Sequence, residues 1–264
     1  MVDPVLSVTY ALNAVAMIAL PIVVGIVIVR RLKTRWSLLG WGALTFIASQ
    51  GVRLPLLFGL TALLQGREVM SPEAATVFNI VFLSLTAGLF EEGARWLGYR
   101  FIIRDARRWE DAVTYGAGHG GIEAIIFGVL AGLTLVNMVV LRGLDLTTLP
   151  MTAEQLELTR VGLEAFWSAP WYLTILGAVE RVFALTLHIT LSAMVLQCFT
   201  RGNRWWLLAA MLWHALANIV GVGVAQTAGP LAAEGALAVV ALVSLGLLLW
   251  LRRPAATVNP EVAA

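Results

Sequence analysis

Seven long apolar stretches dominate this sequence and decide which solvent the folded chain can occupy. They lie at about residues 6–29, 37–62, 74–98, 113–141, 170–199, 205–226 and 231–251. A helix needs about 20 mostly apolar residues to cross the hydrocarbon core of a bilayer, and each stretch meets that length. Of the 264 residues, 59% are apolar and only 13% are charged, whereas a soluble domain has about a quarter of its residues charged. The sequence therefore predicts an all-α, polytopic transmembrane helix bundle that forms one integral membrane domain over residues 1–264.

Basic residues are distributed unevenly between the two ends of these predicted helices. Consecutive helices cross a membrane in alternating directions, which places twelve of these residues in connections or tails on one side. Three, Arg67, Arg142 and Arg160, lie on the other side. Cytoplasmic connections of membrane proteins are enriched in lysine and arginine. We therefore expect the N-terminus outside and the C-terminus in the cytoplasm, in the cell (inner) membrane of a bacterium.

A short amphipathic segment separates the fourth and fifth stretches. Thr152 and Gln155 have the spacing of a capping box, in which two side chains satisfy free backbone N–H groups at a helix start. Glu154, Glu157 and Glu164 would then share one water-facing side. This pattern predicts an interfacial helix that leads into the fifth span.

Ionisable side chains inside the predicted spans are the feature that points to function. Such groups are rare and costly in hydrocarbon, and by default they mark a functional site. Residues four apart share one helix face, so each of four consecutive spans presents a polar stripe. Span by span, the members are Glu91, Glu92 and Arg95; His119 and Glu123; Glu180, Arg181 and His188; and His214 and Asn218.

These polar groups lie at comparable depths when counted from the charged residues at the basic end. With a rise of about 1.5 Å per residue, Glu91 lies roughly 13 Å from that end and His119 about 12 Å. The same count gives about 15 Å for His214 and about 20 Å for His188. Four helices of alternating direction can therefore bring these side chains to one cavity in the cytoplasmic half of the membrane.

The residue types suit the activation of water. Imidazole and carboxylate are usual zinc ligands, and three protein ligands leave an open position for water. A nearby carboxylate can act as general base, and a bound metal lowers the pKa of the water toward neutrality. Without a metal, a desolvated glutamate paired with histidine could still activate water, while Asn218 and a histidine stabilise an oxyanion. Zinc is therefore a candidate cofactor.

The motifs in these spans resemble those of known intramembrane proteases. Glu91-Glu92-Gly-Ala-Arg95 resembles the EExxR motif of the CAAX-processing and bacteriocin-processing (CPBP) superfamily, and His214-Ala-Leu-Ala-Asn218 resembles its late HxxxN motif. Gly118-His119-Gly-Gly-Ile-Glu123, with Glu180-Arg181 and His188, is more similar to the YhfC family, and it is also similar to PrsW-type proteases. The resemblance covers about residues 85–220.

This resemblance implies a conical cavity open to the cytoplasmic side and peptide hydrolysis inside the bilayer. It makes Glu91 or Glu92 the catalytic glutamate and Asn218 the oxyanion or ligand residue. It also implies partners that bind a metal or water, and it leaves open whether His119 or Glu123 points into the site. These partners are His119, Glu123, His188 and His214. The expected substrate is a membrane-embedded or lipidated peptide or protein, and no nucleic acid is expected as a partner.

The charged groups beside these motifs have structural interpretations as well. Arg95 could form a salt bridge with one of the two adjacent glutamates, and Arg181 could orient His188 along their shared face. Glu180 lies at a depth similar to that of Arg53 in the second span, so we expect these two residues to form an ion pair.

Two other classes of function use the same kind of buried cluster. Carboxylate and histidine chains in membranes also relay protons in proton-coupled transporters. The two halves of this chain show no inverted repeat and no matched pair of interrupted helices, however. A non-catalytic membrane scaffold could keep the cluster for packing alone.

Overall fold

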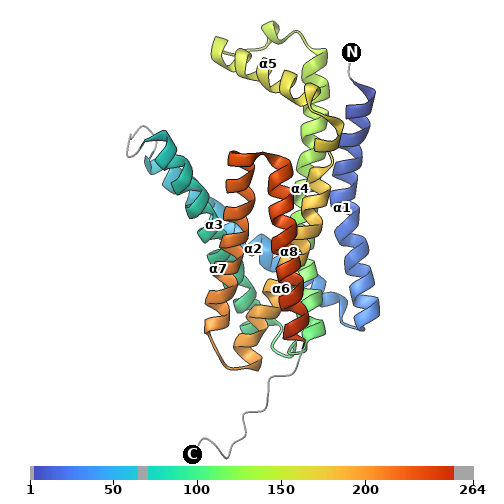
Figure 1. The fold of residues 1–264 in the computed structure, drawn as a ribbon, viewed down its shortest axis with the longest axis vertical. Coiled ribbons are helices and arrows are strands. Elements are labelled where there is room, and N and C mark those ends of the chain that lie inside the picture. Colours follow the sequence, from blue (N-terminus) through green and yellow to red (C-terminus); the bar gives the residue numbers. More distant parts are fainter. Residues whose placement is uncertain (1–2, 65–70, 253–264) are drawn as a thin grey trace, which may run out of the picture.

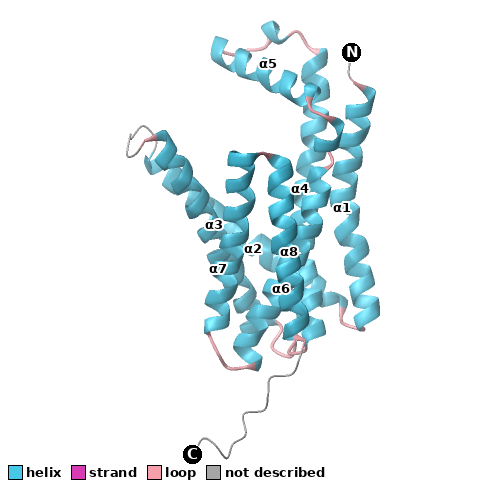
Figure 2. Cartoon of the chain, viewed as in Figure 1, coloured by secondary structure: helices cyan, strands magenta, loops and turns pink. Residues whose placement is uncertain are grey.

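The computed structural model describes residues 3–64 and 71–252, and within those ranges it contains helices and no strand (Figures 1 and 2). The α-helices are α1 (Pro4–Leu32), α2 (Trp36–Leu64), α3 (Pro72–Leu97), α4 (Trp109–Gly143), α5 (Ala153–Ser168), α6 (Leu176–Thr200), α7 (Trp205–Ala228) and α8 (Pro230–Leu251). A π-helical turn, η1 (Gly98–Ile102), extends α3, and two 3₁₀ turns, η2 (Leu146–Thr148) and η3 (Trp171–Leu173), flank α5.

Seven of the described helices are long and apolar enough to cross a membrane, and they coincide with the seven predicted spans. Large apolar side chains on their outer faces are strongly exposed, as for Phe58 (72%) and Leu133 (60%). Hydrocarbon is the solvent in which such faces are stable, so the prediction of a polytopic transmembrane bundle is confirmed. Arg67 and Arg253, which entered the count of basic residues, lie outside the described residues.

The fifth span runs over Trp171–Thr200, close to the expected 170–199, but its α-helix begins later than the sequence predicted. The expected helix started at residue 170, but η3 occupies Trp171–Leu173 and α6 begins at Leu176. The N-cap residue of α6, Ile175, has no side-chain acceptor for the free N–H groups of the first turn. Asn13 of α1 reaches this turn: its Oδ1 accepts from the backbone N–H of Ala178 at 2.7 Å, and the carbonyl of Ile175 accepts from the same N–H at 3.1 Å. A contact from a distant helix thus helps to set where α6 starts.

Helix α5 lies across the end of the bundle that also holds the N-terminus (Figure 1). The predicted capping box is present: Thr152 Oγ1 accepts from the N–H of Gln155 at 3.2 Å, and Gln155 Oε1 accepts from the N–H of Thr152 at 2.9 Å. Glu154, Glu157 and Glu164 are exposed on its surface. The prediction of a short amphipathic helix before the fifth span is confirmed.

Helix α4 packs in the middle of the bundle, against α1, α2 and α6. Its glycines allow this close approach: a Cβ at Gly118 would lie 2.1 Å from the carbonyl oxygen of Leu39 in α2. A Cβ at Gly120 would lie 2.8 Å from Cβ of His188 in α6. The run of glycines therefore brings two neighbouring backbones up to His119 while α4 itself stays continuous.

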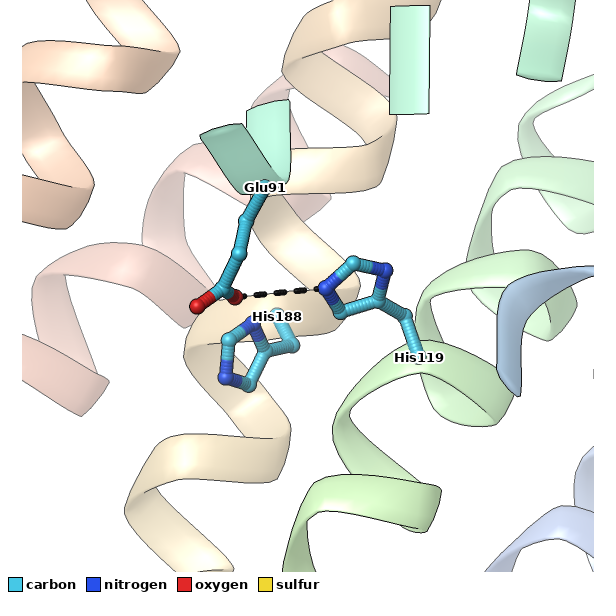
Figure 3. A group of neighbouring side chains, drawn as sticks. All are labelled: Glu91, His119 and His188. Carbon is cyan, nitrogen blue, oxygen red and sulfur yellow. Dashed lines mark hydrogen bonds and ion pairs between the residues drawn. The ribbon is translucent and has the colours of Figure 1, made fainter. Parts of the chain in front are cut away.

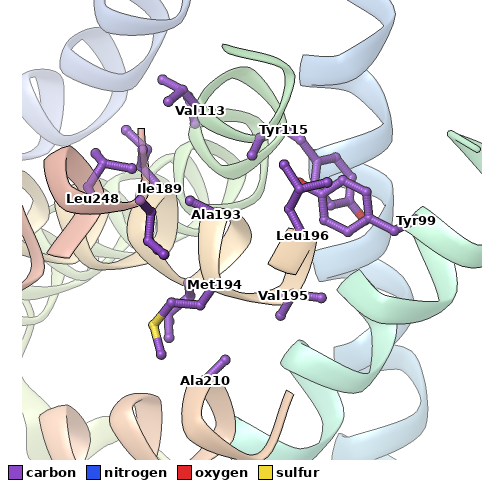
Figure 4. Packing of buried hydrophobic residues seen from close by; sticks show 14 of the residues in the cluster. Tyr99, Val113, Tyr115, Ile189, Ala193, Met194, Val195, Leu196, Ala210 and Leu248 are labelled. Atoms are coloured by element: carbon purple, nitrogen blue, oxygen red, sulfur yellow. The ribbon is translucent and has the colours of Figure 1, made fainter. Parts of the chain in front are cut away.

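The apolar core fills the basic end of the bundle, where α4 and α7 begin and α6 and α8 end. Figure 4 shows the packing of part of this cluster from close by. Tyr99 and Tyr115 are fully buried, and their ring centroids lie 4.9 Å apart. Leu191 and Val195 of α6 are also fully buried in this cluster. Close packing at native density leaves little room for water, so this end of the bundle is closed.

Candidate functional site

The three histidines lie close to a glutamate at the centre of four helices, next to the apolar core on the side away from the basic end. Glu91 comes from α3, His119 from α4, His188 from α6 and His214 from α7, and each residue is 5% exposed or less. The ring centroids of His119 and His188 are 5.5 Å apart, and those of His188 and His214 are 5.3 Å apart. The structure therefore brings together the side chains that the sequence placed in one layer.

The two adjacent glutamates have different surroundings. Glu91 lines a cavity, and its Oε1 accepts a hydrogen bond from Gln50 Nε2 at 3.0 Å. Glu92 is fully buried behind it and forms an ion pair with Arg95. His214 Nδ1 lies 2.8 Å from Glu92 Oε1. Glu91 is thus the carboxylate that a cavity-bound molecule can reach, whereas Glu92 holds Arg95 and His214 in place.

The hydrogen bonds indicate which ring nitrogen carries the proton in His119 and in His214. Thr45 Oγ1 donates to the carbonyl of Gly42 at 2.8 Å, so it accepts from His119 Nδ1 at 3.3 Å. His214 Nδ1 likewise donates to the Glu92 carboxylate. In each neutral ring the Nε2 atom is then left with a lone pair.

Both lone pairs face the same oxygen. Glu91 Oε2 lies 3.2 Å from His119 Nε2 and 3.9 Å from His214 Nε2. Two lone pairs and a carboxylate repel one another unless a proton or a cation lies between them. This arrangement is therefore suited to holding a positive ion or a shared proton.

His188 has a different environment from the other two histidines. A guanidinium can only donate, so His188 Nδ1 accepts from Arg95 Nη2 at 2.7 Å. Its proton is then on Nε2, which contacts the Glu123 carboxylate. Arg181 Nη1 donates to the other oxygen of Glu123 at 3.0 Å. The expected link between Arg181 and His188 is therefore indirect and passes through Glu123.

The donor set fits a divalent metal ion. One ligand atom from each of Glu91, His119 and His188 lies within 4.8 Å of the others. Figure 3 shows these three side chains next to one another, with the Glu91 carboxylate in contact with His119. Two atoms that bind one tetrahedral zinc at 2.0–2.1 Å lie about 3.3 Å apart, which is close to the 3.2 Å between Glu91 Oε2 and His119 Nε2. Distance thus favours His188 as the third ligand, whereas the proton assignment favours His214.

A cavity of about 630 Å³ leads away from this site. On each helix that carries a site residue, the lining residues lie level with the site or farther from the basic end, such as Phe127 on α4, Ala184 on α6 and Asn218 on α7. The core at the basic end closes the other direction. The resemblance implied a cavity open to the cytoplasm, and the charge distribution predicted that the basic end is cytoplasmic. Packed tyrosines and α6 side chains fill the basic end, so these two expectations do not hold together.

The expected ion pair between Arg53 and Glu180 is wrong. Glu180 pairs with its neighbour Arg181, and Arg53 instead donates to Thr86 and to the carbonyl of Leu83 in α3. Equal depth along two helix axes does not fix the direction in which each side chain points. Arg53 faces α3, whereas Glu180 is held on α6.

Two polar neighbours of the candidate site in α2 were missed by the sequence reasoning. Thr45 sets the tautomer of His119, and Gln50 binds Glu91. Both are uncharged, so neither carries the large cost that marks an ionisable group in a membrane. The available signal was the clustering of Thr45, Ser49 and Gln50 as uncharged polar residues in a stretch that is mostly apolar.

Comparison with known proteins relates the chain to a family model and to a curated membrane protein. A family model described as YhfC intramembrane metalloprotease matches residues 16–242, which include every residue of the site. A protein of Bacillus subtilis (strain 168), described as "Uncharacterized membrane protein YhfC", is 32% identical over 146 residues. That alignment covers 54% of this chain and 55% of the relative, so the match spans about half the length of each protein. No solved structure matches the chain.

Proposed function

The chain belongs to the YhfC intramembrane metalloprotease family, and from that premise and the site geometry we propose that it is an intramembrane endopeptidase. It is an integral membrane protein with seven apolar helices long enough to span a bilayer. The observation that carries the proposal is that Glu91 Oε2 faces the Nε2 atoms of His119 and His214, and that Glu91 and His214 line a cavity. Such a set is better suited to activating water than to joining helices.

We assign the candidate metal ligands to Glu91, His119 and His214, with zinc as the ion that best suits these donors. Bound zinc would polarise the peptide carbonyl and lower the pKa of a bound water. His214 is preferred to His188 because its Nε2 is free, whereas both nitrogens of His188 are already in contact with Arg95 and Glu123.

The remaining roles belong to groups of the chain itself. Glu91 Oε2 faces the proposed ion, so Oε1, which Gln50 contacts at 3.0 Å, is the oxygen that accepts the proton of the attacking water and returns it to the leaving amine. Asn218 lines the cavity one helical turn beyond His214, and its amide can donate to the oxyanion that forms on the peptide carbonyl. Glu92 and Arg95 act as positioning residues for His214 and His188.

The proposed substrate is a membrane-embedded or lipidated peptide, because the cavity lies between spans and its walls are largely apolar. We also propose that the basic end is cytoplasmic, as the excess of basic residues indicates. The cavity then faces the outer half of the membrane, so the substrate is cut from that side.

Labelling of introduced cysteines tests this orientation. In a Cys198→Ala background, a membrane-impermeant maleimide should label Glu157→Cys on α5 in intact cells. Arg104→Cys, which is exposed at the basic end, should react only after lysis. The opposite pattern would reverse the orientation.

The experiment that tests the activity uses the full chain in liposomes with a set of membrane-tethered peptides. Mass spectrometry should find new peptide termini, and a zinc chelator should abolish them until zinc is restored. If no peptide is cut while a dye inside the liposomes reports proton movement, the chain is a transporter and the endopeptidase proposal is wrong.

A further inference from the structure

Arg53 differs from the other arginines within the spans. Arg95 contacts Glu92, and Arg181 contacts Glu123. No carboxylate of the described residues lies within the 4 Å ion-pair distance of Arg53. Charged side chains within a membrane almost always pair with another group of opposite charge or line a water-filled cavity, so the charge of Arg53 needs an explanation.

The Arg53 side chain is nevertheless held firmly. Its Nε donates to Thr86 Oγ1 at 3.4 Å, its Nη1 to Gln50 Oε1 at 3.3 Å and its Nη2 to the carbonyl of Leu83 at 2.8 Å. These acceptors are all neutral. They use about three of the five N–H groups of a guanidinium, so the positive charge and two donors remain available to a ligand.

The guanidinium also has access to the candidate active site. Arg53 lines the 630 Å³ cavity and a neighbouring cavity of about 360 Å³ between α3 and α7, and Asn218 lines both. Gln50, which accepts from Arg53, donates to Glu91 at 3.0 Å. Arg53 is therefore connected to the proposed base by two successive hydrogen bonds.

We propose that Arg53 binds a carboxylate of the peptide substrate. The path from Arg53 to Glu91 consists of two hydrogen bonds with the Gln50 amide between them. Its length is roughly that of two or three extended residues. The carboxylate would thus lie two or three residues from the bond that is cut. It belongs either to an aspartate or glutamate side chain or to a free chain terminus.

Depth argues against a lipid headgroup as the source of the anion. Arg53 lies eleven residues from the end of α2 at Leu64, about 16 Å at the rise of a helix. Headgroup phosphates lie outside the hydrocarbon core, whereas a peptide in the cavity can bring its own carboxylate to this depth. A carboxylate there is costly without a partner, so Arg53 would select for it.

This inference rests on the proposed function, and binding can test it apart from cleavage. The full chain carrying Glu91→Gln is placed in lipid nanodiscs to prevent turnover. Binding of labelled transmembrane peptides is measured for three pairs: aspartate against asparagine at two positions, and free acid against amide at the terminus. We expect the carboxylate form of one pair to bind about tenfold more tightly or better, and that pair identifies the source.

Substitutions of Arg53 test whether this residue causes the preference for the carboxylate peptide. Arg53→Gln should abolish the preference, Arg53→Lys should keep most of it, and Arg53→Glu should reverse it for a peptide that carries lysine in place of aspartate. The matched control is Arg142→Gln, which removes an exposed arginine outside the cavity and should leave the preference intact. A preference that persists in Arg53→Gln, or no preference in any pair, would overturn the proposal. An Arg53-dependent preference in a chain that cuts no peptide would keep this inference and refute the proposed function.

Discussion

The buried ion pair between Glu92 and Arg95 gives the sharpest prediction for stability. Both side chains are fully buried, and Arg95 has one carboxylate partner among the described residues. Glu92→Gln leaves the guanidinium with no carboxylate partner among the described residues. Removing one member of a buried pair costs about 3–5 kcal/mol. The unfolding equilibrium should therefore shift by roughly a hundredfold to several thousandfold.

The double variant Glu92→Gln/Arg95→Gln makes the reasoning testable. Because it removes both charges, it should be more stable than Glu92→Gln alone, although the second change removes another side chain. The free energy of unfolding can be measured by steric trapping in bicelles for both single variants and the double variant. Glu180→Gln, whose partially exposed carboxylate pairs with Arg181, is the matched control and should change stability by no more than about 1 kcal/mol. If the two single effects simply add in the double variant, Glu92 and Arg95 do not act as a charge pair.

Two further variants test the packing of α4 against α2 and the tautomer of His119. Gly118→Ala places a Cβ against the carbonyl of Leu39 and should cost about 1–3 kcal/mol. Gly40→Ala, which meets nothing within 4 Å, should not lower stability in the same unfolding measurement, because alanine favours a helix more than glycine does. Equal effects would refute the close contact of α2 and α4. Thr45→Val removes the acceptor that orients His119 and should weaken zinc binding about 10- to 100-fold in a competition titration. An unchanged affinity would show that the threonine does not set the tautomer.

The sequence was sufficient for the fold because membrane spans have a required length. Seven apolar stretches predicted seven helices, and the cost of ionisable groups in hydrocarbon identified Glu91 and the histidines as a cluster. The start of α6 was not predictable in the same way. It depends on Asn13 of α1, and the neighbour that caps a helix is known only after the helices are packed.

The direction in which side chains point accounts for the other differences. Glu91 and Glu92 are separated by about 100° around a helix, but the sequence does not fix which of those directions faces the cavity. The same limit produced the wrong pairing of Glu180 with Arg53. The cavity leads away from the basic end because Tyr99 and neighbouring side chains fill that end, a property of packing that single motifs do not contain.

The most direct test of the central claim is the rate at which the chain, in liposomes, cuts a membrane-tethered peptide when Glu91 is replaced. Glu91→Gln keeps the size of the side chain and its hydrogen bond with Gln50, but it removes the carboxylate that faces His119 and His214. We expect the rate to fall at least about a hundredfold, while Glu157→Gln on exposed α5 leaves it unchanged. Cleavage by Glu91→Gln at the rate of the unmodified chain would contradict the account.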